Sequence, residues 1–180
     1  GRYIKASNDI RSSGGSQIDV GNASYGYLRV AQSGSSSRLK VQVIKGDKTY
    51  NYDLNTNGNF EVFPLQSGNG SYTIRIMKNV EGNKYTQVYS TTVDVTLKSE
   101  LEPFLCPSQY VNYNENSAVV KKAAEICSGL TGDIEKVSAV YKWIIDNITY
   151  DSNKAQTVKT GYLPSPDSTL STKNGICFDY

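Results

Sequence analysis

Hydrophobic and polar residues alternate along the first half of the chain. Leu39, Val41 and Val43 alternate with lysine and glutamine, and Tyr72 and Ile74 alternate in the same way further along. A period of two places such residues on one face of a β-strand. Similar short segments predict further strands at 17–20, 25–30, 49–54, 60–65, 85–89 and 92–97.

Turn signals separate these predicted strands. Lys45-Gly46-Asp47-Lys48 is typical of a hairpin turn, and Asn57-Gly58 supplies the positive φ angles of a tight turn. Pro64 is expected at an edge or at a strand end, because proline cannot donate to a sheet. Regular strand spacing predicts an antiparallel β-sandwich of immunoglobulin-like type over residues 1–97. The Cys-Trp-Cys core of antibody domains is absent, so this resemblance concerns architecture alone.

The pattern changes after residue 97. Residues 98–116, with Pro103 and Pro107, are interpreted as a linker. Ser117 is placed to cap a helix that runs through Cys127, and Gly129 is a natural stop.

A second helix is predicted to start near Thr131-Gly132-Asp133. Its apolar positions recur at spacings of three and four, which predicts one buried stripe. These positions are Ile134, Val137, Val140, Tyr141, Ile144, Ile145 and Ile148. A long irregular loop is expected after this helix, up to the C-terminal motif. The predicted fold class is therefore β + α, with the sandwich followed by the helical part of an α+β domain at 117–180.

Composition excludes several classes of function. A formal net charge of +2, 38% hydrophobic residues and 20% charged residues describe an ordinary globular chain. Lys and Arg are scattered, which argues against nucleic acid as a partner. No apolar run approaches the roughly 20 residues of a membrane span, and no signal-peptide core is present. Without histidine a Cys/His metal site is excluded, and we expect neither a metal nor a cofactor.

Composition also hints at location. The chain has 14 Tyr against 4 Phe, and its first half is rich in Gly, Ser, Asn and Thr, which suits strands with polar outer faces. We interpret this as an extracellular or cell-envelope protein whose signal peptide is absent from this sequence. Cys106 and Cys127 either pair with each other or are two separate buried thiols, and the sequence favours neither alternative.

The C-terminal motif is the candidate for chemistry. In Gly175-Ile176-Cys177-Phe178-Asp179-Tyr180, a glycine precedes the cysteine and an acid follows it. This pattern favours a tight turn that delivers the thiol to a helix start, where the helix dipole favours thiolate. The alternative is that Cys177 is one more buried thiol.

This motif resembles the nucleophile motif of transglutaminase-like cysteine enzymes, which have a papain-like fold. Together with Ile148 to Asp151 and the preceding helices, it is similar to the front of a bacterial transglutaminase-like domain that follows an immunoglobulin-like module. The resemblance implies acyl transfer through a Cys177 thioester on a protein or peptide amide. Water as acceptor gives a protease or amidase, and a lysine amine gives a crosslinker. It also implies a histidine and an acid that follow the cysteine.

The sequence departs from the family at this point. It contains no histidine, and three residues follow Cys177. Asp179 is adjacent to the cysteine and has no imidazole to orient, so its expected role is to help cap the helix. Phe178 to Tyr180 are too few to form that helix. We therefore expect an N-terminal fragment of an enzyme, inactive by itself.

Two other functions stay open. One is a non-catalytic extracellular module that serves as a spacer or binds protein or polysaccharide; the other is a degenerate family member. An uncovered apolar helix stripe tends to find a partner, so we expect self-association through Val137, Val140, Tyr141 and Ile144, or a second fragment of the same protein bound there.

Overall fold

The computed structural model describes residues 2–180, which form two compact units. The first unit ends at Gln109, and the second runs from Tyr110 to Tyr180. The fold is mixed, with antiparallel β-sheets in the first unit and helices in the second, as the β + α prediction requires.

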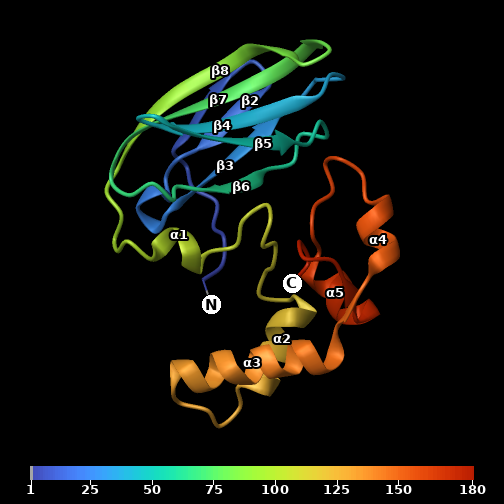
Figure 1. The fold of residues 1–180 in the computed structure, drawn as a ribbon. Helices are drawn as coiled ribbons and strands as arrows, with labels where there is room; N and C mark the ends of the chain where they lie inside the picture. The colour runs from blue at the N-terminus through green and yellow to red at the C-terminus, as the bar shows by residue number, and fades with distance from the viewer. Residues whose placement is uncertain (1) are drawn as a thin grey trace. The chain divides into compact units, whose positions relative to one another are not determined.

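The first unit consists of two four-stranded antiparallel sheets (Figure 1). One sheet has the order β1-β2-β3-β6, with bounds Ile10–Ser13, Ser16–Asp19, Tyr27–Gln32 and Glu61–Pro64. The other has the order β5-β4-β7-β8, with bounds Lys48–Leu54, Leu39–Lys45, Gly70–Glu81 and Lys84–Val95. A short 3-10 helix, η1 (Ala23–Tyr25), precedes β3.

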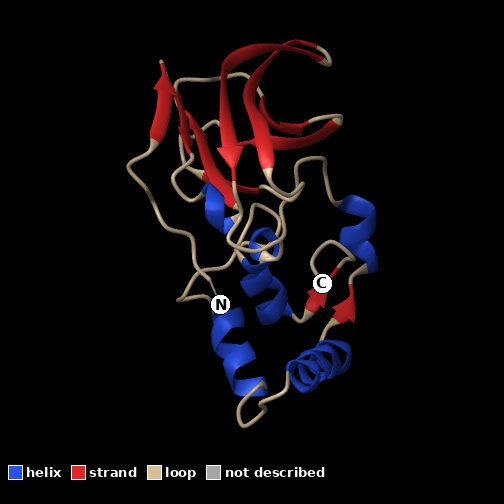
Figure 2. Cartoon of the chain, turned by 90° about the vertical axis from the view of Figure 1, so that its left-hand side faces the viewer, coloured by secondary structure: helices blue, strands red, loops and turns tan. Residues whose placement is uncertain are grey.

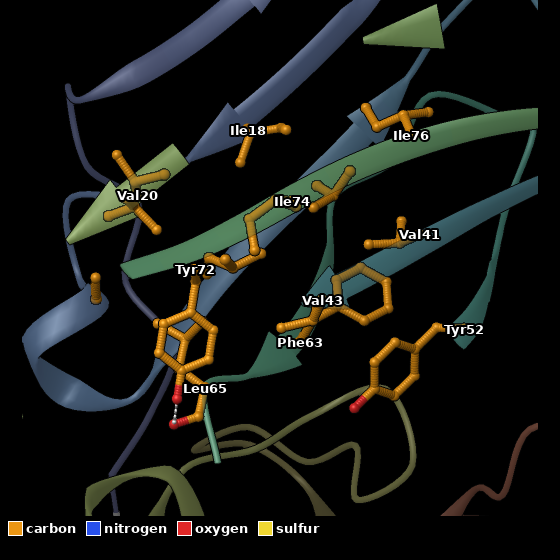
Figure 3. Close-up of a cluster of buried hydrophobic side chains, with 14 of the residues drawn as sticks. Ile18, Val20, Val41, Val43, Tyr52, Phe63, Leu65, Tyr72, Ile74 and Ile76 are labelled. Carbon is orange, nitrogen blue, oxygen red and sulfur yellow. Dashed lines mark hydrogen bonds between the residues drawn. The ribbon is translucent and has the colours of Figure 1, made fainter. Parts of the chain in front are cut away.

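The two sheets share one hydrophobic core (Figure 3). The alternation predicted for the central strands is confirmed: Leu39, Val41 and Val43 are each at most 1% exposed, and so are Tyr72 and Ile74. Complete removal of an aliphatic side chain from water stabilises a fold by about 1.5–3 kcal/mol. These inward positions therefore supply most of the driving force for the sandwich.

Turn geometry follows the sequence signals. The β4–β5 hairpin closes with Lys45 opposite Lys48, and Gly46 has a φ of +58°. Pro64 ends the edge strand β6, as predicted. Two features differ from the prediction: β1 was not expected, and the single long strand β8 contains the segment 85–89 and residues 92–95 of the segment 92–97.

Tyr72 joins the core to a neighbouring loop. The residue is 1% exposed, and its hydroxyl bonds the carbonyl oxygen of Leu65 at 3.2 Å (Figure 3). The hydroxyl shares its one proton with the Gly68 carbonyl oxygen at 2.8 Å and accepts from the amide of Ser67 at 2.9 Å. The hydroxyl therefore keeps its hydrogen bonds although the ring is buried. The immunoglobulin-like type of this sandwich stays a prediction.

The segment after β8 packs on the sandwich. It includes α1 (Glu102–Leu105), and Glu102 is buried in an ion pair with Arg2. Further on, Gln109 donates from its side chain to the Asp53 carbonyl (2.6 Å) and to Glu61 (3.1 Å). Part of the predicted linker is thus ordered against the first unit, while the predicted boundaries at 97/98 and 116/117 stay predictions.

The second unit is mainly helical (Figure 2). Its helices are α2, α3, α4 and α5, with bounds Ala118–Ile126, Asp133–Asn147, Ser152–Thr157 and Pro166–Thr172. Two short strands, β9 (Thr149–Tyr150) and β10 (Asn174–Gly175), pair in parallel.

The two predicted helices α2 and α3 are confirmed, but the cap of α2 differs. Ser117 precedes α2 without capping it, and its hydroxyl accepts instead from the Asn114 amide at 3.0 Å. The open amide of Val119 is bound by the Asp167 carboxylate of α5 at 2.9 Å. A carboxylate at a helix N-terminus also complements the helix dipole, so Asp167 fulfils the role expected of Ser117.

The apolar stripe of α3 is not buried, contrary to the prediction. No residue of α3 is buried, and Ile134, Val137, Tyr141 and Ile145 are 56% to 86% exposed. The periodicity identified the helix correctly. It did not predict whether another element covers the stripe, because periodicity shows which residues share a face and does not show what packs against that face.

The region predicted as a long irregular loop contains α4 and α5. The Asp151 carboxylate caps α4 by accepting from the Lys154 amide at 2.8 Å. Ser165 caps α5 by accepting from the Ser168 amide at 3.3 Å, and Pro166 occupies the first turn. Both helices have only six or seven residues, so their caps are stronger signals than any periodicity.

Candidate functional site

The two segments that most resemble the transglutaminase-like pattern lie side by side. The Thr149 amide donates to the Lys173 carbonyl at 2.8 Å, and the Asp151 amide donates to the Gly175 carbonyl at 2.9 Å. These bonds form the parallel pair of β9 and β10. The chain from Ile148 to Asp151 therefore fixes the strand that leads into Cys177.

Gly175 is required at its position by close packing. A Cβ added there would lie 3.0 Å from Asp179 Cβ and 3.2 Å from Thr169 Cγ2. Contacts this short force the neighbouring side chains to move. The glycine two residues before the cysteine thus permits Asp179 to fold back against the strand.

Cys177 lies in a hydrogen-bonded turn. The Asp179 amide donates to the Ile176 carbonyl at 2.8 Å, and the Ile176 amide donates to Asp179 Oδ2 at 2.9 Å. This reciprocal pairing closes the turn 176–179 around Cys177. No helix is assigned over this turn within residues 2–180, so the capping role of Asp179 stays a prediction.

The cysteine is exposed and its neighbour is not. Cys177 is exposed to solvent, whereas Ile176 is only 6% exposed. The buried isoleucine anchors the turn and leaves the sulfur accessible. The alternative that Cys177 is a buried thiol is therefore wrong.

Asp179 is a buried carboxylate with a complete set of donors. Its side chain is 0% exposed. It accepts hydrogen bonds from the Lys154 ammonium (2.7 Å), the Tyr162 hydroxyl (2.6 Å) and the Ile176 amide (2.9 Å). Lys154 Nζ also lies 2.5 Å from the Tyr162 hydroxyl oxygen. We call Lys154, Tyr162 and Asp179 the anchor cluster.

The anchor cluster is charged. Burial raises the pKa of Asp179, but the hydrogen bonds from Lys154, Tyr162 and Ile176 outweigh it and hold this pKa below the ordinary carboxyl value. Burial lowers the pKa of Lys154, but its bonds to Asp179 and Tyr162 outweigh this and raise that pKa. Both shifts favour the ion pair at neutral pH.

Aromatic rings surround the side chain that follows the cysteine. The Phe178 ring lies edge-on to Tyr110 with a centroid distance of 5.3 Å, and to Tyr162 with a centroid distance of 6.3 Å. Tyr162 therefore contacts two residues of the turn, one through its hydroxyl and one through its ring.

A cleft of 170 Å³ opens beside the turn, and Asp179 and Tyr180 form part of its wall. Its other lining residues are largely apolar and come from α2, α3, α5 and their flanks: Val119, Trp143, Ile144, Ile148, Pro166, Thr169 and Leu170.

The other two cysteines differ from Cys177. All three thiols are free; Cys106 is buried and Cys127 is partly buried. Burial raises the pKa of Cys106, so it is a poor nucleophile at neutral pH. Within residues 2–180, no group of three or more His, Cys, Asp and Glu residues has the arrangement of a metal site. Nor does any helix in that range have the length and apolarity of a membrane span.

The sequence predicted Cys177 as the nucleophile and Asp179 as a cap, and both roles stay predictions. It missed Lys154 and Tyr162. Their side chains meet Asp179 across 25 and 17 residues of sequence. No periodicity or spacing rule connects residues so far apart. The one available signal was Asp179, the acid two residues after the cysteine, because a buried carboxylate needs hydrogen-bond donors or a countercharge.

Comparison with known proteins bears on the second unit. Residues 119–180 match the family model described as a transglutaminase-like domain, which supports that family for this part of the chain. The UPF0252 protein MJ1282 of Methanocaldococcus jannaschii is 29% identical over 68 residues. That alignment covers 34% of this chain and 19% of the relative, so the match spans about a fifth of the relative's length. No solved structure matches the chain.

Proposed function

We propose that Cys177 is the nucleophile of a transglutaminase-like reaction on amide bonds of a protein or peptide. The observation that carries this proposal is the exposed thiol in a hydrogen-bonded turn closed by Asp179, inside the segment that matches the family model. Backbone amides at a helix start stabilise a thiolate and an oxyanion.

The reaction has two steps. The Cys177 thiolate attacks the amide carbonyl carbon, a carbon–sulfur bond forms, and the carbon–nitrogen bond breaks as the amine leaves with a proton. Water or a lysine amine then attacks the thioester, loses a proton and releases the thiolate. Both steps need a base and acid near the sulfur. The 180 residues contain no histidine, so we propose that polypeptide outside them supplies the imidazole and its orienting acid.

Turnover of the full-length gene product tests this proposal. Hydrolysis or amine exchange of peptide amides should disappear in Cys177→Ala and persist in Cys127→Ala, which changes a partly buried cysteine of the same unit. The 180-residue chain alone should give no turnover. Activity that survives in Cys177→Ala would show that the protein is an enzyme with a different nucleophile. Absence of any activity in the unmodified protein would favour a non-catalytic binding or spacer module.

We also propose that the sandwich is an immunoglobulin-like spacer or substrate-positioning module of an exported protein. The Tyr72 hydroxyl that returns to the backbone of residues 65–68 is the arrangement of the tyrosine corner of such sandwiches. Polar strand faces suit an extracellular setting. Fractionation of cells that express the full-length gene product should recover it outside the cytoplasm, and a purely cytoplasmic product would refute the export.

A further inference from the structure

We propose that Lys154 and Tyr162 are positioning residues for the Cys177 turn, and that they act through the buried carboxylate of Asp179. The inference rests on the proposed function, because a role in positioning presupposes that Cys177 reacts. Neither residue is adjacent to the cysteine in sequence.

The first step of the argument is the geometry of Asp179. Its Oδ2 receives both the Ile176 amide (2.9 Å) and the Lys154 ammonium (2.7 Å), while Oδ1 receives the Tyr162 hydroxyl (2.6 Å). The bond to Ile176 spans the cysteine and closes the turn around it. Whatever orients the carboxylate therefore also fixes the backbone of Cys177.

The second step is the origin of the two donors. Lys154 lies on α4, and Asp151 caps that helix through the Lys154 amide at 2.8 Å. The Asp151 backbone amide in turn donates to the Gly175 carbonyl at 2.9 Å. The short segment from Asp151 to Lys154 therefore makes both contacts. Its backbone binds strand β10, and its Lys154 side chain binds the Asp179 carboxylate.

The third step is hydrogen-bond balance. The Tyr162 hydroxyl has one proton, which it donates to Asp179, and it accepts from Lys154 Nζ at 2.5 Å. Removal of either donor leaves the Asp179 carboxylate with a specific missing interaction. Tyr162→Phe takes one donor from the carboxylate, and Lys154→Met leaves the carboxylate buried without its countercharge. A buried carboxylate that loses a donor no longer holds one orientation.

The test measures two properties of the full-length gene product. The first is hydrogen exchange of the amides of residues 176–179, which reports the turn itself. The second is the pH profile of Cys177 alkylation by iodoacetamide, resolved by mass spectrometry. The variants are Lys154→Met and Tyr162→Phe. One matched control is Lys142→Met on α3, whose side chain is 74% exposed. The other is Tyr85→Phe on β8, in the first unit.

The expected result is graded. Exchange of the Ile176 amide should accelerate by about tenfold or more in Lys154→Met, less in Tyr162→Phe, and not in the controls. Alkylation at neutral pH should slow by about threefold or more in the same order, because the proposed reactivity of Cys177 needs an ordered turn. Cys177 is already exposed, so greater accessibility cannot speed its reaction. Thermal unfolding identifies a variant that has lost its fold. If Lys154→Met has lost its fold, the milder Tyr162→Phe variant tests the positioning role.

The outcomes separate the two proposals. Unchanged exchange at residues 176–179 in both variants would overturn the positioning role, whatever the alkylation shows. Faster exchange with an unchanged alkylation profile would reduce the cluster to a structural one and also overturn it. A wild-type Cys177 that reacts no faster in the folded protein than in urea would count against the proposed function, while the exchange data would still report on the turn.

Discussion

The sandwich and the helical unit treat their apolar residues in opposite ways. In the sandwich, two sheets cover each other, and residues such as Ile74 and Phe63 are 0% exposed. In the helical unit, the apolar residues of α3 face solvent, and Ile134 is 86% exposed. An amphipathic pattern therefore identifies an element in both units, but stability follows only where a second layer packs on it.

The two units also differ in how they use a buried carboxylate. Asp19 in the sandwich is 2% exposed and binds Arg29 at 2.6 Å, next to the core residue Ile18 on β2. Asp179 in the helical unit binds Lys154 beside an exposed cysteine. The same ion-pair chemistry thus stabilises strands in one unit and a turn around a thiol in the other.

A matched pair of isoleucines gives the largest expected difference. Ile74→Ala should destabilise the protein by about 2–5 kcal/mol, because it removes a fully buried side chain and leaves a cavity. Ile145→Ala makes the same chemical change where the side chain is 56% exposed and should stay within about 0.5 kcal/mol. Urea unfolding of both variants measures the difference. Equal losses would show that α3 is covered in solution.

Loss of the basic partner compares the two carboxylates. Arg29→Met should cost about 3 kcal/mol, because it leaves Asp19 buried and unpaired. Lys154→Met should cost less than Arg29→Met, since the Lys154 side chain is 28% exposed against 15% for Arg29. Thermal and urea unfolding check the order. A larger loss for Lys154→Met would contradict the view that the sandwich is the better-packed unit.

Acid should weaken both units in the same direction. Burial raises the pKa of Asp19, but hydrogen bonds from Ser7, Arg29 and Gly21 outweigh it and leave this pKa lowered, as for Asp179. A lowered folded pKa contributes stability that is complete above the ordinary carboxyl value of about 4 and is lost as pH falls through the folded value.

Unfolding free energies measured from about pH 6 to pH 3 test this expectation. Asp179→Asn should reduce the acid slope, whereas Asp133→Asn, at a side chain that is 100% exposed, should leave it unchanged. The Lys154 contribution has the opposite sign: its pKa is raised, so its stability is present below about 10.4 and is lost as pH rises further. An acid slope that Asp179→Asn does not change would contradict the buried ion pair.

The smallest effect on folding is expected on the face of α3, where association is the readout. We propose that a second copy of the chain covers Val137, Val140, Tyr141 and Ile144, whose side chains line one groove. Val137→Ser, at a residue that is 69% exposed, should shift light scattering toward the monomer, whereas Val88→Ser on β8, at 41% exposure, should not. A clean monomer of the unmodified protein at high concentration would refute self-association.

Local patterns in the sequence predicted local structure well. The strands β4 and β7 and the helices α2 and α3 were predicted because period and caps are properties of neighbouring residues. The short helices α4 and α5 were missed because six or seven residues carry little periodicity. Long-range partners were also missed: Asp167 caps α2 across 48 residues, and nothing in the sequence connects them.

The candidate site shows the same limit. The nucleophile role of Cys177 and the capping role of Asp179 were predicted from a short motif, but the side chains that orient Asp179 come from elsewhere in the chain. Burial itself is a tertiary property, which is why the α3 stripe was wrongly expected inside.

Site-resolved alkylation of the full-length gene product tests the central claim most directly. The rate of reaction with iodoacetamide at neutral pH is measured for each cysteine in the folded protein and again in urea. Activation by the fold should make Cys177 react faster in the folded protein than in urea, whereas the buried Cys106 should react more slowly. Exposure alone can at most restore the unfolded rate. A folded Cys177 that reacts no faster than its unfolded form would contradict its assignment as the nucleophile.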